Sequence, residues 1–212
     1  MGKRVLKARP ETSILINDDL DLLSFIQHFG GVTRLLDFTD SFSVALFFAT
    51  ESCSNYASVW CLKRNELHYD NFKLLNRDKR RKIAQKILNT QKNMSVISFA
   101  PSMLNERIYA QQGLFIMPGI LNKSLADLLE QKLNTNVSVK SISYGDWKDL
   151  GKSIKEDVLI KFDIHRNLSL DILIALRKLN ISANHLFPDI TGICRSFSLL
   201  ASGYRSNKNN FK

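Results

Sequence analysis

The sequence predicts an α+β fold with a mixed, mainly antiparallel sheet and flanking helices. Apolar residues at helical spacing are interspersed with segments rich in β-branched and aromatic residues, without the strict order of a βαβ protein. The chain has 212 residues, 44% of them hydrophobic, which is enough to enclose a sizeable core. We expect a single domain at residues 18–202, between an N-terminal segment at 1–17 and a polar tail at 203–212.

The first elements are predicted in the order helix, turn, strand, helix. Residues 18–28 place apolar side chains on one helical face, and the glycines at 30–31 can supply the positive φ that ends the helix. Residues 32–39, VTRLLDFT, are rich in β-branched and aromatic residues and predict a strand. Asp40 or Ser41 then caps a helix that runs through VALFFATES.

The remaining elements continue the mixture. A basic amphipathic helix is predicted at 73–92 and a shorter helix at 123–133. A helix at 169–180, capped by Asn167 or Ser169, is followed by another after Pro188. Strands are predicted at 58–64, 94–101 and 158–165, and in both arms of a hairpin at 106–119 that turns near Gly113.

Charge and cysteine content narrow the classes of function. The formal net charge is +10, from 30 Lys and Arg against 20 Asp and Glu, which suits contact with phosphate-rich partners. Cys53, Cys61 and Cys194 are odd in number and contain no close pair, so we expect neither disulfides nor a metal site. No apolar run reaches the ~20 residues that span a bilayer. These features are typical of a cytoplasmic protein.

Polar residues interrupt the apolar segment at 25–50. The alternation along 32–39 places Thr33 and Asp37 on one strand face and Arg34 on the other, in a strand that its apolar surroundings predict to be central. A structural network of ion pairs and a ligand site would both explain such charges. The same two interpretations apply to His28 at the predicted helix end. Phosphate-loop, dinucleotide, zinc-protease and serine-hydrolase signatures are absent from the sequence.

Three stretches, in chain order, resemble the FRG domain, a bacterial and phage family. QHFGGVTRLLDFTDSFSVALFFA is similar to the family's QHYGLPTRLLDWT segment and the aliphatic helix after it. NERIYAQQGLFIMPG resembles its NERIRAQQGLF run, and ISANHLFPDITGICRSF resembles its closing helix after a LFPDL turn. The resemblance covers roughly residues 18–200. The (F/Y)RG tripeptide that names the family is absent. Arg4 and Arg9 lie too close to the next motif to replace its arginine.

A looser resemblance, to ADP-ribosyltransferases, suggests what a site in this fold would hold. The order of LLDFTDSFSVALFFA, SVWCL and ERIYAQQGLFIM is similar to that of a hydroxyl-bearing strand, an AxxFA helix and an E-x-E strand in those enzymes. The mapping puts Thr39 and Ser41 near a nicotinamide pocket, Glu106 at the catalytic carboxylate and Gln111 on the turn after it. Arg107 departs from this mapping. It stands directly before Ile108, which aligns with the apolar position of the motif, at a place where the enzymes have Glu.

The two resemblances together imply a cleft for a nucleotide-like ligand, with NAD as a candidate substrate and no resident cofactor. A carboxylate such as Glu106 would stabilise the oxocarbenium-like state formed when nicotinamide leaves. Glu106 also has a structural alternative, as an ion-pair partner of Arg107 or Arg34. We expect the candidates to converge on one pocket. The catalytic candidates are Glu106 and His28, and the binding candidates are Thr33, Arg34, Asp37, Thr39, Ser41, Arg107, Gln111 and Gln112.

The leading hypothesis is ADP-ribosyltransferase-type activity in the conflict between phage and bacterium. Its rivals are a non-catalytic module that binds nucleic acid or a protein partner, and an inactive, N-terminally truncated homologue. Residues 73–86 carry a dense run of Lys and Arg that would contact nucleic-acid phosphates. The run lacks the interleaved aromatic residues of single-strand binding proteins, so a solvated insertion is the favoured interpretation.

Overall fold

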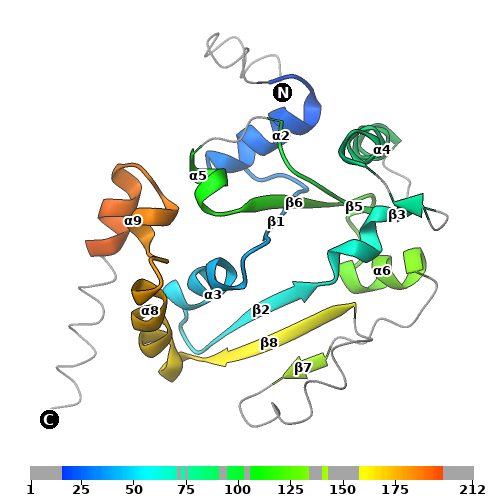
Figure 1. The fold of residues 1–212 in the computed structure, drawn as a ribbon. Helices are drawn as coiled ribbons and strands as arrows, with labels where there is room; N and C mark the ends of the chain where they lie inside the picture. The colour runs from blue at the N-terminus through cyan, green and yellow to red at the C-terminus, as the bar shows by residue number, and fades with distance from the viewer. Residues whose placement is uncertain are drawn as a thin grey trace, which may run out of the picture.

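The protein combines helices and strands in irregular order, and the predicted α+β class with mainly antiparallel pairing is confirmed. Its strands form two three-stranded sheets and a two-stranded ribbon among the described residues, rather than one continuous sheet. Figure 1 shows the first sheet above the second. The computed structural model describes residues 16–70, 73–74, 76–90, 95–102, 106–133, 140–142 and 158–197.

The first sheet has the order β1 (Leu36–Thr39), β6 (Gly113–Pro118) and β5 (Val96–Phe99), and both pairings are antiparallel. β1 is therefore an edge strand, and the prediction that it is central is wrong. The strand also begins later than predicted. The backbone N–H of Leu35 donates to the Thr33 hydroxyl, a local bond that competes with ladder pairing before Leu36.

The second sheet has the order β2 (Tyr56–Leu62), β8 (Leu159–His165) and β7 (Lys140–Ile142). β2 runs antiparallel to β8, whereas β7 runs parallel to it. A short ribbon of β3 (Tyr69–Asp70) and β4 (Lys73–Leu74) takes up the start of the predicted basic helix. That helix therefore begins only at Arg77.

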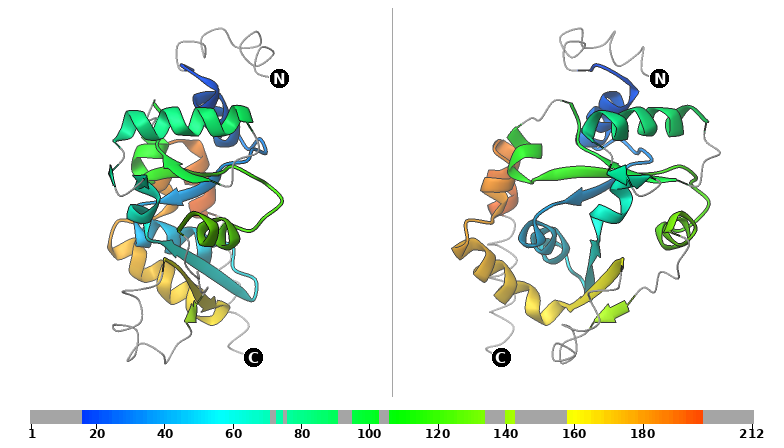
Figure 2. Two further views of the ribbon diagram at one scale, coloured as in Figure 1. Left: turned by 90° about the vertical axis from the view of Figure 1, so that its right-hand side faces the viewer. Right: turned by 45° about the vertical axis from the view of Figure 1, so that its right-hand side comes forward.

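Two helices cover the outer face of the first sheet, α2 (Asp19–His28) and α4 (Arg77–Thr90). Figure 2 shows α4 lying across this sheet on the side away from the second one. Leu20, Ile87 and Phe115 belong to the core cluster that joins them.

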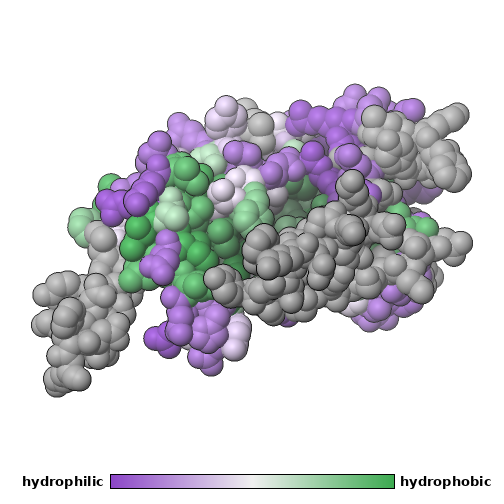
Figure 3. Space-filling view, turned by 60° about the horizontal axis from the view of Figure 1, so that its bottom comes forward, coloured by the Kyte–Doolittle hydropathy of each residue, from purple (hydrophilic) through white to green (hydrophobic). Residues whose placement is uncertain are grey.

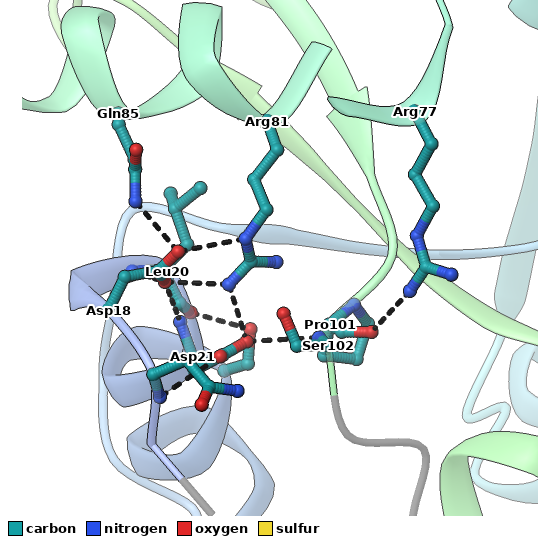
Figure 4. A network of polar contacts seen from close by, with 10 residues as sticks. Asp18, Leu20, Asp21, Arg77, Arg81, Gln85, Pro101 and Ser102 are labelled. Atoms are coloured by element: carbon teal, nitrogen blue, oxygen red, sulfur yellow. Dashed lines mark hydrogen bonds and ion pairs between the residues drawn. The ribbon is translucent and has the colours of Figure 1, made fainter. Parts of the chain in front are cut away.

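Polar contacts also join these two helices (Figure 4). Asp18 caps α2 by accepting from the N–H groups of Leu20 and Asp21, and it also accepts from Arg81 and Gln85 of α4. The predicted helix and its end before the glycines are both confirmed. Gly30 has φ 82° after the helix end.

The inner face of the first sheet packs against α6 (Leu125–Leu133) and the 3-10 helix η2 (Arg64–His68). This second core cluster includes Leu67, Ile116 and Leu129. Nζ of Lys132 donates to two backbone carbonyl oxygens, those of Leu67 and Val96, at 3.0 and 2.9 Å. α6 is thereby fixed against the sheet on the side that faces β2 and β8.

A third cluster holds the C-terminal helices to α3 (Phe42–Glu51). Ser41 caps α3 by accepting from the N–H of Val44, as predicted. The predicted cap of α8 is wrong, because the N-cap of α8 (Ser169–Lys178) is Leu168, which makes no side-chain bond. The 3-10 helix η3 precedes α8, and its own cap is His165. The remaining helical segments are η3 (Arg166–Leu168), α9 (Ala183–Leu186) and residues 190–197.

Residues 106–110 are helical, and the strand predicted there is wrong. They form α5 (Glu106–Ala110), and only the second arm of the predicted hairpin is a strand, β6. The turn between them bends at Gln112, which has φ 47°. Glu, Arg and Ala favour helix, and this local preference decides the conformation of ERIYA.

The surface also carries exposed apolar side chains near the C-terminal helices. Figure 3, which brings the lower side of Figure 1 forward, shows a hydrophobic area bordered by hydrophilic residues on that face. Ile174, Leu179, Ile190 and Phe197 are exposed. No helix in the described part of the chain is long and apolar enough to span a membrane.

Candidate functional site

An open cavity of about 1100 Å³ is lined by strands of both sheets and by the ends of several helices. β1 and β6 contribute from the first sheet, and β2 and β8 from the second. The side walls are residues of α3 and of the start of α6. The cavity therefore depends on segments that are far apart in the sequence.

Five predicted site residues line this cavity: His28, Asp37, Thr39, Arg107 and Gln111. They come from the C-terminus of α2, from β1, and from α5 and the turn after it. The structure thus brings candidates from two resembling motifs to one cavity.

The rest of the lining is largely apolar and aromatic. Phe38 and Phe115 come from the first sheet, Trp60 comes from the second, and Phe48 comes from α3. Trp60 and Phe48 are also partly exposed, with 43% and 38% of their surface accessible. Flat aromatic groups beside a few polar ones are typical of sites for ring-containing small molecules.

Three charged or titratable groups influence one another at one end of the cavity. Burial lowers the pKa of His28 below its ordinary value of 6.5, the positive charge of Arg107 lowers it further, and the carboxylate of Asp189 opposes both. Burial also lowers the pKa of Arg107, while Asp189 raises it. His28 is consequently neutral at neutral pH, so its imidazole can accept a proton.

Arg107 is positioned by an aromatic ring beneath it. Its Cζ lies 4.4 Å from the ring centroid of Phe187, which is 1% exposed. Cζ of Arg195 lies 4.1 Å from the same centroid. Arg195 in turn donates to the carboxylate of Glu51, with Nε 2.9 Å from Oε1. α3, α5 and the C-terminal helices are therefore connected behind the cavity wall.

A chain of hydrogen bonds links all three resembling motifs. The Thr39 hydroxyl donates to the backbone carbonyl of Gln111 at 2.7 Å. The side-chain amide of Gln111 donates to the backbone carbonyl of Leu186 at 2.9 Å. Asp40 N–H donates to the carbonyl of Gln112 at 3.1 Å. Thr39 and Gln111 thus hold the cavity wall together as well as facing it.

The other candidates do not line the cavity, and most of them make local structural contacts. Glu106 is exposed at the first position of α5. Thr33 donates to the side chain of Gln27, and Ser41 caps α3. Gln112 is exposed in the turn before β6. Neither of the predicted ion-pair partners of Glu106, Arg107 or Arg34, pairs with it among the salt bridges of the described residues.

Arg34 is a structural residue by its contacts. A terminal nitrogen of its guanidinium donates to the carbonyl oxygens of Pro118 and Gly119, at 2.7 and 2.8 Å. These carbonyls lie at the end of β6, beyond the pair of Leu36 with Ile116 at which its ladder with β1 stops. Burial lowers the pKa of Arg34. The structural alternative placed Arg34 and Asp37 in a network of ion pairs, but neither residue is among the salt bridges of the described residues.

Sequence reasoning missed several residues of this region. Asp189 lies in the third resembling motif but was given no role, although its charge acts on both His28 and Arg107. Ser58 and Trp60 line the cavity from β2 and were treated only as strand residues. The Pro188-Asp189 pair, a turn signal after an apolar run, was the one available indication for Asp189.

Comparison with known families gives a match at the N-terminal part of the chain. The family model of the FRG domain matches residues 3–58, which include His28, Asp37 and Thr39. The match begins before the domain boundary expected at residue 18. Comparisons with curated proteins and with solved structures gave no match. The resemblance stated from the sequence is thus confirmed over residues 3–58, where the chain matches the FRG-domain model.

Proposed function

We propose that the cavity of this FRG-domain protein binds a nucleotide-like ligand, with NAD as the first candidate. The observation that carries the proposal is the arrangement of His28, Asp37 and Arg107 around one cavity of about 1100 Å³. Ligand cavities of ~300–1,000 Å³ enclose drug-sized molecules, so this one has room for a dinucleotide.

The chemistry of the lining matches the parts of such a ligand. Trp60 and Phe48 offer aromatic faces for a base or a nicotinamide ring. Arg107 offers a guanidinium to a phosphate, and its contact with Phe187 already orders the side chain. Asp37 and the Ser58 hydroxyl are suited to ribose hydroxyl groups.

ADP-ribosyltransferase-type activity is the catalytic form of the same proposal, in the setting of conflict between phage and bacterium. The bond between C1′ of ribose and the nicotinamide nitrogen breaks, and its electron pair leaves with nicotinamide. A nucleophile of the acceptor, or water, bonds to C1′ and passes its proton to neutral His28. Asp37, rather than Glu106, is the carboxylate at the cavity that would stabilise the positive charge on the sugar.

The test measures NAD binding by isothermal titration calorimetry for the unmodified protein and two variants. Arg107→Ala removes a charge-assisted contact to phosphate and is expected to weaken binding about 10- to 100-fold. Glu106→Gln is the matched control, because it alters the neighbouring residue outside the cavity. The control should bind NAD as the unmodified protein does.

Nicotinamide release separates the catalytic form from binding alone. Asp37→Asn should reduce the rate of release more than it reduces affinity, because it acts on charge that develops in the transition state. Binding without release would leave a nucleotide-binding module. Absence of NAD binding, or equal effects of the Arg107 and Glu106 variants, would rule out this site.

A further inference from the structure

A second, smaller cavity of about 230 Å³ adjoins the first. Gly113 and Leu114 line both cavities, so the start of β6 is their common wall. The hydroxyl-bearing residue Ser98, 1% exposed, belongs to the lining of the smaller one. Its charged lining residues are Asp40, Arg64, Arg77, Arg80 and Arg81.

The arginines converge because of helical spacing. Arg77, Arg80 and Arg81 lie three and four positions apart in the first turns of α4, so they share one face of the helix. Arg64 reaches the same cavity from η2. Lys79 and Lys82 of the same helix do not line the cavity.

Carboxylates of the described residues pair with two of these arginines, Arg64 and Arg81. Arg81 contacts Asp18 and Asp21, each at 2.7 Å, and it is therefore committed to the junction of α2 and α4. Figure 4 shows Arg81 pointing toward these carboxylates, whereas Arg77 points to the neutral carbonyl of Pro101.

The guanidiniums that line the cavity also act on one another. Asp40 pairs with Arg64 and is the one carboxylate among the described residues that line the cavity. Burial lowers the pKa of Arg80, and the charges of Arg64 and Arg77 lower it further. Like charges held together in a concave site create a positive potential that an anion relieves.

We infer that this cavity binds a phosphate group of a small-molecule ligand. Guanidinium forks match the geometry of phosphate oxygens, and several of them converge here. The site goes beyond the proposed function, because Arg107 and the larger cavity are not needed for it.

A small ligand fits this geometry better than a nucleic acid does. A polymer backbone needs an open, positively charged surface along which several phosphates are contacted. Here the arginines line a concave space of about 230 Å³, which admits the end of a molecule. The phosphate group belongs to a free phosphate compound or to a nucleotide that extends from the neighbouring cavity, and the two sources are separable by competition.

The experiment titrates inorganic diphosphate and inorganic phosphate into the full chain by calorimetry. The double variant Arg77→Gln/Arg80→Gln should bind diphosphate about tenfold more weakly or worse, because it loses charge-assisted contacts. The control Lys79→Gln/Lys82→Gln removes the same charge from the exposed side of the same helix. Its affinity should stay within about threefold of the unmodified value, as expected for screened surface charges. Arg81 is left unchanged because it pairs with Asp21.

Each outcome decides for or against the site. Equal weakening by the two double variants would mean long-range attraction only and would overturn the proposal. So would duplex DNA binding that is lost in the lysine variant while diphosphate fails to bind. A thermal melt in phosphate-free buffer checks folding, and Arg80→Lys, which keeps the charge but loses the fork, should bind at an intermediate level.

Competition identifies the source of the phosphate. NAD that displaces diphosphate would place a nucleotide phosphate in this cavity, whereas simultaneous binding would indicate a separate phosphate compound. Arg107→Ala should leave diphosphate affinity unchanged. An Arg107 variant that binds NAD normally would therefore contradict the site in the larger cavity. An Arg77/Arg80 variant that binds diphosphate normally would contradict the site in the smaller one.

Discussion

The guanidinium of Arg107 lies over the ring of Phe187, with Cζ 4.4 Å from the ring centroid. The two residues are separated by a long stretch of chain, and each belongs to a different motif of the family resemblance. The contact fixes the direction in which Arg107 enters the cavity. It also makes a buried hydrophobic residue part of the support for a candidate ligand contact.

Truncating the ring should be costly. Phe187→Ala is expected to lower the free energy of unfolding by about 3–5 kcal/mol, because it removes a buried ring and its cation contacts. Phe197→Ala is the control, since Phe197 is 68% exposed, and it should change stability by less than about 0.5 kcal/mol. Urea unfolding followed by fluorescence measures both. Similar losses would show that Phe187 does not anchor this region.

The pKa of His28 should respond to its two charged neighbours in opposite directions. Arg107→Gln removes a positive charge and should raise the pKa, whereas Asp189→Asn removes a negative charge and should lower it. Titration of the imidazole proton resonances by NMR measures both shifts. If the pKa of His28 is unchanged in both variants, burial alone lowers it.

Stability should fall on acidification through the ordinary histidine range. The folded-state pKa of His28 lies below the unfolded value of 6.5, so the unfolded chain takes up a proton first as pH drops. The contribution of neutral His28 is full above about pH 6.5 and is lost as pH falls toward the lowered folded pKa.

Thermal melts between about pH 5 and 8 test this dependence. His28→Gln should flatten the slope that His28 causes. His185→Gln is the matched control, because His185 is exposed and bonds to the nearby Ser182. An unchanged slope in the His28 variant would assign the acid sensitivity to other groups.

The junction of α2 and α4 should be sensitive to one arginine and not to its neighbour. Arg81→Met leaves the buried Asp21 with only backbone donors, including the N–H of Ser102. We expect a loss of about 2–3 kcal/mol, below the ~3–5 kcal/mol of a fully buried pair because Arg81 is partly exposed. Lys82→Met, on the exposed side, should be nearly neutral.

Acidification should reduce the loss of stability that Arg81→Met causes. Burial raises the pKa of Asp21, but hydrogen bonds from Ser102 and Arg81 and the charge of Arg81 bring it below the ordinary value. Without Arg81 the carboxyl will protonate at higher pH, so the difference in stability between variant and unmodified protein should shrink below about pH 4. Chemical unfolding at two pH values measures the change. A constant difference would point to lost packing instead of lost charge.

Local signals predicted much of the secondary structure. The helix at α2, its end before Gly30 and the Ser41 cap of α3 depend on short-range capping and spacing, which the sequence carries directly. α5 was missed because the interpretation of residues 106–119 as a hairpin outweighed the helix preference of ERIYA. The split into two sheets depends on which strands pair across long loops, and no local pattern encodes that choice.

The candidate site was predictable in part, because local sequence patterns select polar residues but do not specify where the fold places them. His28, Asp37 and Arg107 were chosen as polar residues in apolar or family-like segments, and they do line one cavity. Their placement relative to Asp189 is set by the turn after Phe187, which sequence spacing does not specify. Arg34 looked the same as these in the sequence. Its guanidinium instead binds carbonyls at the end of β6.

The strand pairing has a consequence for any attempt to isolate the segment that matches the family. β1 lies before residue 58 and β2 overlaps it. Among the described strands, each is hydrogen-bonded only to one much later in the chain, β1 to β6 and β2 to β8. A fragment that stops near residue 58 would expose the unpaired backbone N–H and C=O groups of both strands to solvent. Such exposed strand edges promote intermolecular cross-β association. The recognisable stretch is therefore a signature and not an autonomous folding unit, and limited proteolysis should yield no stable core of that size.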